Sequence, residues 1–142
     1  MKKGVVMSVV GAGGSFISYL LGGIDSLVQT LVIAMMIDYV SGLLVGGVFH
    51  NSPKTENGTL ESKASYKGLV RKFMIFLLVV IANRLDLELG ISYCRDAVCF
   101  AFIANETLSI IENMGLMGIP IPSVITNGIE LLKEKGEQNN EL

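Results

Sequence analysis

The sequence predicts an all-α integral membrane protein with three transmembrane helices, a Gly-rich hydrophobic helix before them and an amphipathic helix after them. Apolar residues, counted with glycine and without tyrosine, make up roughly 60% of the chain, against about 45–50% in soluble domains. Charged residues are only 17% of the chain, and its mean hydropathy is +0.57. Nearly uncharged stretches of membrane-spanning length, separated by a polar basic loop, give the same indication.

The N-terminal segment, residues 1–26, is hydrophobic but rich in glycine. Gly4 to Ile24 contains no charged residue, and six of its residues are glycine. A stretch of this length can cross a bilayer, whereas its glycines lower its helix propensity. We therefore expect either a fourth span or a helix that lies at the membrane interface.

A membrane domain is predicted over residues 27–114. Its first span, about 27–49, contains one charged residue, Asp38. As a helix it would reach roughly 35 Å, which is enough for a hydrocarbon core of about 30 Å. A polar loop with proline, glycine and asparagine, residues 50–68, follows this span.

The second span is expected at about 73–89, directly after the basic residue Lys72. It is short, and its charges gather near one end, where long side chains can reach the interface. Arg84 and Glu88 are four residues apart there, so they can form an ion pair on a helix.

The third span, about 93–114, is polar along one side. At 100° per residue, most of its ionisable and amide side chains fall within an arc of about 120° on a largely apolar helix. We interpret this polar stripe as a pore lining of several assembled copies. Alternatively, it is an internal ion-pair network that fixes helix register. The candidate residues are Arg95, Asn105, Glu106, Ser109 and Glu112.

A packing ridge follows one side of the first span at steps of four residues and consists of Ala34, Asp38, Gly42 and Gly46. Small residues let helices approach closely in lipid, and Gly42 and Gly46 form a GxxxG pair. An ionised carboxylate in mid-span costs about 2.5–3.5 kcal/mol, so Asp38 should face protein or water. The ridge packs either between copies or within one chain, with Asp38 bound by Arg84, Arg95 or a hydroxyl group.

Residues 115–142 are expected to leave the membrane. Pro120 and Pro122 stop any helix, and Ser123 is suited to begin an amphipathic one. We expect that helix to end near Gly136 and a polar cytoplasmic tail to follow.

Basic residues indicate the orientation of the chain. The loop after the first span and the start of the second hold five of them, which predicts that this loop faces the cytoplasm. The C-terminal tail, with Lys133 and Lys135, then lies on the same side. A fourth span would also place Lys2 and Lys3 inside, so the count favours four crossings slightly and leaves both alternatives open.

The composition argues against several functions. A net charge of −2 does not favour nucleic-acid binding, which needs a basic surface. One histidine, His50, and two cysteines five residues apart, Cys94 and Cys99, provide no metal-ligand set and no catalytic triad. We therefore expect no enzymatic activity, no cofactor and no bound metal.

Three stretches resemble the phage holin family that includes the clostridial toxin-secretion holins. Asp38-Tyr-Val-Ser-Gly42 resembles the family's signature of aspartate, aromatic, aliphatic, hydroxyl and glycine residues. Lys67 to Leu78 is similar to the basic approach to the family's second helix. Phe102 to Ile125 is similar to its Asn-Glu and Glu-Asn segment with the two-proline exit. The stretches cover roughly residues 35–135, and the Gly-rich N-terminal segment departs from the family's pattern.

The resemblance implies a multi-pass protein of the bacterial cytoplasmic membrane, encoded by a phage or prophage or beside a toxin gene. Such proteins form homo-oligomers and open lesions that release an endolysin or a toxin, and an antiholin is a further candidate partner. The alternatives are a small ion channel or transporter subunit, and a non-conducting antiholin or membrane scaffold. By position, the family-like residues are Asp38, Gly42, Asn105, Glu106, Ser109 and Glu112.

Overall fold

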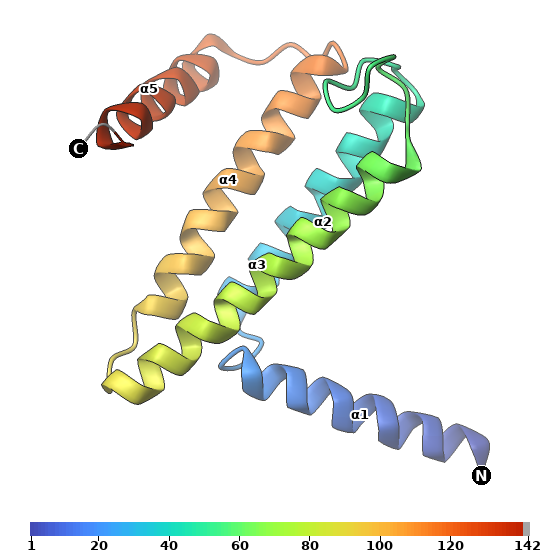
Figure 1. Cartoon of the computed structure of the whole chain (residues 1–142), viewed down its shortest axis with the longest axis vertical. Coiled ribbons are helices and arrows are strands. Elements are labelled where there is room, and N and C mark those ends of the chain that lie inside the picture. The colour runs from blue at the N-terminus through green and yellow to red at the C-terminus, as the bar shows by residue number, and fades with distance from the viewer. Residues whose placement is uncertain (141–142) are drawn as a thin grey trace.

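A computed structural model describes residues 1–140, all of whose regular elements are helices (Figure 1). Consecutive helices α2, α3 and α4 run antiparallel in one bundle, whereas α1 and α5 leave it at opposite ends. The all-helical prediction is confirmed for this part of the chain. The bounds are α1 (Lys2–Leu20), α2 (Ser26–Gly47), α3 (Ser62–Leu89), α4 (Cys94–Leu116) and α5 (Ser123–Asn140).

Side chains and one glycine set the helix ends on the side of the α1–α2 linker. Asp25 begins α2, because its carboxylate accepts a 3.1 Å hydrogen bond from a main-chain N–H of the first turn. Gly90 ends α3 in the left-handed conformation, with φ of +65°. Asp86 of α3 then accepts the N–H groups of Cys94 and Arg95 at 2.9 and 3.0 Å, and so caps the next helix.

Two predicted boundaries are wrong. The loop predicted over residues 50–68 is helical in its last part, because α3 begins at Ser62. The charged side chains there end a lipid-compatible stretch, but lysine and arginine are good helix formers and do not end the helix. Helix α5 likewise continues through Gly136 to Asn140, since one glycine costs only about 1 kcal/mol in a helix. The remainder of the predicted tail, residues 141–142, lies outside the described residues.

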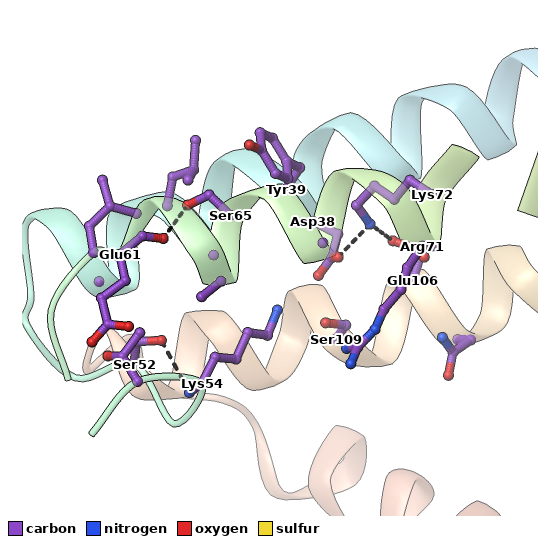
Figure 2. A pocket seen from close by; sticks show the side chains of 18 of the residues that line it. Asp38, Tyr39, Ser52, Lys54, Glu61, Ser65, Arg71, Lys72, Glu106 and Ser109 are labelled. Carbon is purple, nitrogen blue, oxygen red and sulfur yellow. Dashed lines mark hydrogen bonds and ion pairs between the residues drawn. The ribbon is translucent and has the colours of Figure 1, made fainter. Parts of the chain in front are cut away.

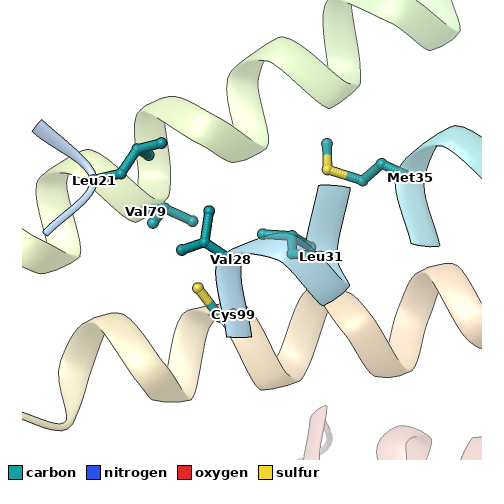
Figure 3. Packing of buried hydrophobic residues seen from close by; sticks show 6 residues of the cluster. All are labelled: Leu21, Val28, Leu31, Met35, Val79 and Cys99. Atoms are coloured by element: carbon teal, nitrogen blue, oxygen red, sulfur yellow. The ribbon is translucent and has the colours of Figure 1, made fainter. Parts of the chain in front are cut away.

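An apolar core occupies the half of the bundle next to the α1–α2 linker. It joins that linker to α2, α3 and α4, and each member is at most 5% exposed (Figure 3). Helix α2 packs mainly against α4. Helix α3 also packs mainly against α4 and makes fewer contacts with α2. The core residues are Leu21, Val28, Leu31, Met35, Val79 and Cys99.

The outward faces of the helices are apolar as well. Helix α1 has no buried residue, and its valine, methionine and phenylalanine side chains are exposed all round. On α2 the exposed apolar side chains include Ile33, Met36, Ile37, Val40 and Leu44, and on α3 Leu69, Phe73, Met74, Leu77 and Ile81. Contiguous apolar surfaces of this size indicate contact with lipid or with other protein copies.

By length and composition, two helices of the described chain, α1 and α2, could each cross a membrane. Helices α3 and α4 are longer than α1 but contain more charged residues. The crossing of the membrane at 73–89 and 93–114 therefore stays a prediction.

Candidate functional site

A cluster of three ionisable side chains joins α2, α3 and α4 at mid-length of the bundle. Lys72 on α3 donates to Asp38 Oδ2 on α2 at 2.7 Å and to Glu106 Oε2 on α4 at 2.5 Å (Figure 2). The side chains of Lys72, Asp38 and Glu106 are only 13%, 9% and 5% exposed. In this Lys72 cluster, a single ammonium group connects three helices through two carboxylates.

Asn113 and Ser41 complete the polar surroundings of Asp38. Asn113 Nδ2 donates to Ser41 Oγ at 2.8 Å and to Asp38 Oδ1 at 3.3 Å. Ser41 Oγ donates in turn to the main-chain oxygen of Asp38 at 3.0 Å. Among the side chains that the structure describes, no buried nitrogen or oxygen lacks a hydrogen-bond partner. The polar groups inside this bundle are therefore satisfied within the chain.

The predicted ionic partners of Asp38 are wrong. Neither Arg84 nor Arg95 contacts Asp38; its cation is Lys72. The error has a physical cause. A span that begins at residue 73 places Lys72 before the helix, where it cannot face the interior of the bundle. Since α3 begins at Ser62, Lys72 is an interior residue of the helix and faces the bundle. The predicted pair of Arg84 and Glu88 does form, at 3.2 Å on the exposed surface of α3.

A cavity of about 430 Å³, with both polar and apolar groups in its walls, adjoins the Lys72 cluster on the side of the loop between α2 and α3. Its walls come from α2, from α3, from α4 and from the loop, residues 48–61 (Figure 2). Members of the packing ridge and of the polar stripe, which lie far apart in the sequence, meet here. The predicted residues that line the cavity are Asp38, Gly42, Gly46, Asn105, Glu106 and Ser109.

The packing ridge of α2 faces the interior of its own chain. Ala34, Asp38 and Gly46 are buried, and Gly42 is half-buried in the cavity wall. A Cβ atom at Gly46 would lie 3.2 Å from the main chain of Leu60, so glycine permits a close approach of the loop. This placement supports packing within one chain; contact of the ridge between copies stays a prediction.

The polar stripe of α4 is divided between different surroundings. Arg95 and Glu106 are buried in ion pairs within the chain, which supports the register-fixing alternative for these two residues. Ser109 is half-buried in the cavity wall, whereas Asn105 and Glu112 are exposed. A pore lining formed by all five stays a prediction, because it requires Arg95 and Glu106 to exchange their partners.

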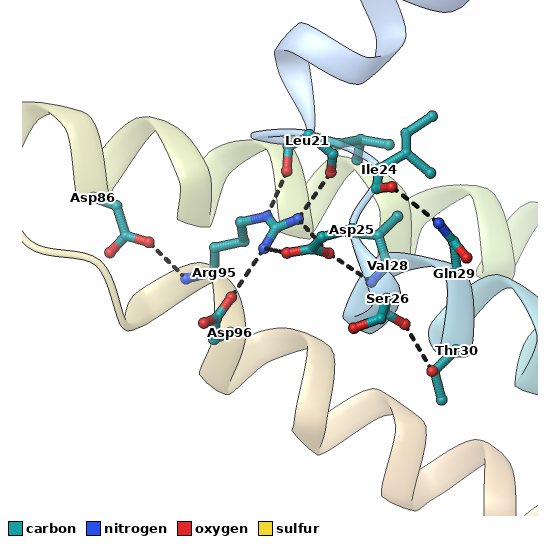
Figure 4. Close-up of polar contacts among 11 residues, drawn as sticks. Leu21, Ile24, Asp25, Ser26, Val28, Gln29, Thr30, Asp86, Arg95 and Asp96 are labelled. Atoms are coloured by element: carbon teal, nitrogen blue, oxygen red, sulfur yellow. Dashed lines mark hydrogen bonds and ion pairs between the residues drawn. The ribbon is translucent and has the colours of Figure 1, made fainter.

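A second ionic cluster surrounds Arg95 at the opposite end of the bundle (Figure 4). Arg95 Nε donates to the main-chain oxygen of Leu21 at 2.6 Å, and a terminal nitrogen donates to that of Gly23 at 2.9 Å. Both terminal nitrogens bind the carboxylate of Asp25 at 3.0 Å, and Asp96 accepts another bond at 2.9 Å. This Arg95 cluster fastens the α1–α2 linker to the start of α4.

Two further features hold the linker in place. The hydrogen bond from Arg95 holds the pKa of the Asp25 carboxyl below its usual range, and the N–H of Val28 acts in the same direction. Asn83 on α3 donates to the main-chain oxygen of Leu20 at 3.2 Å. Gly22 has a φ of +75°, and a Cβ atom there would overlap the side chain of Asn83.

Sequence reasoning missed Lys72, Asn113 and Asp25 as site residues. A signal for Lys72 was present, since it continues the inward face of α3 at helical spacing from Val79 through Ile75. For Asn113, a position on the polar arc of α4 did not reveal that it would contact Asp38. The side chain of Asp25 gains its partner only through the fold, because Arg95 is 70 residues away.

Comparison with known proteins identifies relatives along most of the chain. The family model described as the bacteriophage holin family matches residues 15–134. A probable holin of Bacillus phage phi105 is 32% identical over 125 residues, which cover 87% of this chain and 86% of that protein. An uncharacterised protein of Listeria monocytogenes is 40% identical over 129 residues, which cover 90% and 86% of the two chains. No solved structure matches the chain.

The family match contains both ionic clusters and the cavity between α2, α3 and α4. It also contains all three stretches that carry the resemblance, and it leaves out the first 14 residues of the Gly-rich segment. The resemblance predicted from residues 38–42, 67–78 and 102–125 is thereby confirmed. The chain belongs to the bacteriophage holin family.

Proposed function

We propose that the chain acts as a holin, which oligomerises in the bacterial cytoplasmic membrane and opens lesions that release an endolysin or a toxin. The Lys72 cluster is the observation that carries this proposal. Three helices of membrane-spanning length neutralise their mid-length charges on one another, while α2 and α3 expose many large apolar side chains. Buried charges in lipid-length helices are tolerated when they are paired inside a bundle, so α2, α3 and α4 suit a bilayer.

The distribution of basic residues supports an orientation for the proposed three crossings. The loop 48–61, the start of α3 and α5 lie at one end of the bundle, and α1 joins it at the other (Figure 1). Lys54, Lys63 and Lys67 belong to the first end, which we therefore assign to the cytoplasm. Helix α1 contacts lipid in this arrangement, either as a fourth span or along the outer face.

The proposed route to a lesion begins with the exposed apolar faces. Helices α2 and α3 bring copies together through these faces, because Asp38 and Lys72, their charged residues at mid-length, point into the bundle. Opening then requires α4 to turn its polar stripe from its own chain toward water. The charges of Glu106 and Lys72 are satisfied in the closed chain and would be satisfied by water in the open assembly.

Induced expression in a bacterium, with and without a cytoplasmic endolysin, tests this function. A lesion-forming holin should collapse the membrane potential in both strains and should clear the culture only when the endolysin is present. An ion channel or transporter subunit would change the potential without releasing the endolysin. An antiholin or scaffold would do neither, and either of these results would contradict the proposal.

A further inference from the structure

The cavity beside the Lys72 cluster reaches far into the bundle from the loop end. Ser109 in its wall lies seven residues before the end of α4, which is roughly 10 Å along the helix axis. Beyond Ser109 the cavity reaches Asp38 and Glu106 of the Lys72 cluster, at mid-length of the bundle, and the apolar residues Ile75 and Phe102 line its inner end. Hydroxyl and amide groups line much of the way: Ser52, Thr55, Thr59, Ser65, Asn105 and Ser109.

Two further cations line this cavity, Lys54 and Arg71. Both reach toward Ser109, Lys54 from the loop and Arg71 from α3 (Figure 2). In the part of the chain that the structure describes, neither side chain forms an ion pair. Both residues are exposed, and Arg71 adjoins Lys72 at mid-length of the bundle. A cationic side chain without a partner costs about 2.5–3.5 kcal/mol at the centre of a bilayer, so Arg71 requires a polar medium there.

The other half of the bundle is occupied by the apolar core. Around Leu31 and Met35, the apolar core closes the bundle between the Lys72 cluster and the α1–α2 linker. Leu31, Val79 and Cys99 are fully buried. Close-packed apolar side chains leave no room or hydrogen-bond partners for water.

We infer that the cavity is a water-filled vestibule, which opens at the loop end of the bundle and reaches the Lys72 cluster. Water hydrates Lys54 and Arg71 and reaches mid-length, while the apolar core is the remaining barrier to the other face. The side of the membrane on which the vestibule opens rests on the orientation proposed above; its existence does not. A small hydrophilic solute can therefore reach the cluster from one side only.

Thiol labelling in sealed membrane vesicles tests the vestibule. Ser109→Cys is a nearly isosteric change in the cavity wall, and Cys94→Ser removes the half-buried native thiol, while the fully buried Cys99 remains as an internal reference. The matched control is Val40→Cys, two residues from Asp38 on the exposed apolar face of α2. The probe is a charged methanethiosulfonate, which does not cross the bilayer and reacts with thiolates, which form in water.

We expect Ser109→Cys to react from the loop side at least about tenfold faster than Val40→Cys or Cys99. Asn105→Cys, a second position in the cavity wall, should show the same preference if the Ser109 variant fails to fold. Equal, slow rates at both cavity positions from either side would overturn the inference. Slow rates that rise only after detergent separates the oligomers would also overturn it, since a second copy would then fill the cavity.

The same measurement separates this inference from the proposed function. Fast labelling from the outer side alone would retain the vestibule but reverse the orientation assigned from the basic residues. A third outcome is fast labelling from the loop side together with no lysis of cells that contain the endolysin. This outcome would support the vestibule and contradict lesion formation. Dye retention by the vesicles must be shown first, because an open lesion would expose both faces to the reagent.

Discussion

Lys72 and Arg95 are both largely covered cations, but the bundle holds them in different ways. Arg95 gives five hydrogen bonds to carboxylates and main-chain oxygens, and a guanidinium has five N–H groups. Lys72 gives two, both to carboxylates, although an ammonium has three N–H groups. Arg95 lies beside the close-packed core, whereas Lys72 lies beside the cavity.

This difference assigns separate roles to the two ends of the bundle. A planar guanidinium bound on every edge fixes the geometry of its partners, as the α1–α2 linker requires. An ammonium on a flexible stem binds as a point charge and can exchange one carboxylate for another, or for water. We therefore expect the linker end to stay intact and the loop end to rearrange when a lesion opens.

The largest effect is expected from Lys72→Met, which leaves Asp38 and Glu106 buried without their cation. Removing one partner of a buried ion pair costs about 3–5 kcal/mol. The free energy of unfolding in mixed micelles, followed by circular dichroism, should fall by this amount, and lysis should be lost. A matched control is Lys67→Met, an exposed position on the same helix, for which we expect a change below about 0.5 kcal/mol.

A second substitution shows whether the loss comes from the carboxylates. Glu106→Gln removes the charge of one of the two carboxylates that bind Lys72, so the double variant with Lys72→Met contains one uncompensated carboxylate instead of two. We expect the double variant to be more stable than Lys72→Met alone, which is non-additive behaviour of residues in contact. Purely additive losses would mean that the cluster does not act as a unit.

A smaller effect, about 2 kcal/mol, is expected from Arg95→Lys, which keeps the charge but loses most of the fork of hydrogen bonds. The carboxyl of Asp25 should then titrate closer to its usual pKa, because its main partner is lost. Asp25 stabilises the fold at neutral pH, and this contribution disappears as the pH falls below about 4. Carboxyl NMR titration in micelles measures the pKa of Asp25 in the unaltered chain and in the Arg95→Lys variant. An ordinary pKa for Asp25 in the unaltered chain would contradict its pairing with Arg95.

The sequence predicted the elements better than it predicted their contacts. Hydropathy and proline placement predicted the helices, and the motifs at residues 38–42, 67–78 and 102–125 predicted the family. The partner of Asp38 was missed, since absence of charge defines a lipid-compatible stretch but does not define where a helix begins. The contact of Arg95 with Asp25 joins residues 70 positions apart, and no local pattern encodes such a pairing.

The smallest effect is expected from Gly22→Ala, which tests whether the α1–α2 linker at the Arg95 end of the bundle is rigid. Gly22 has a φ of +75°, and a Cβ atom there would displace the side chain of Asn83 from the linker, so we expect a loss of about 1–2 kcal/mol in unfolding free energy. Gly13→Ala in α1 is the matched control, because a Cβ atom there meets nothing within 4 Å and alanine favours the helix. Equal stability of both variants would show that the linker is not held in one conformation. The Arg95 end of the bundle could then no longer be called rigid in contrast to the Lys72 end.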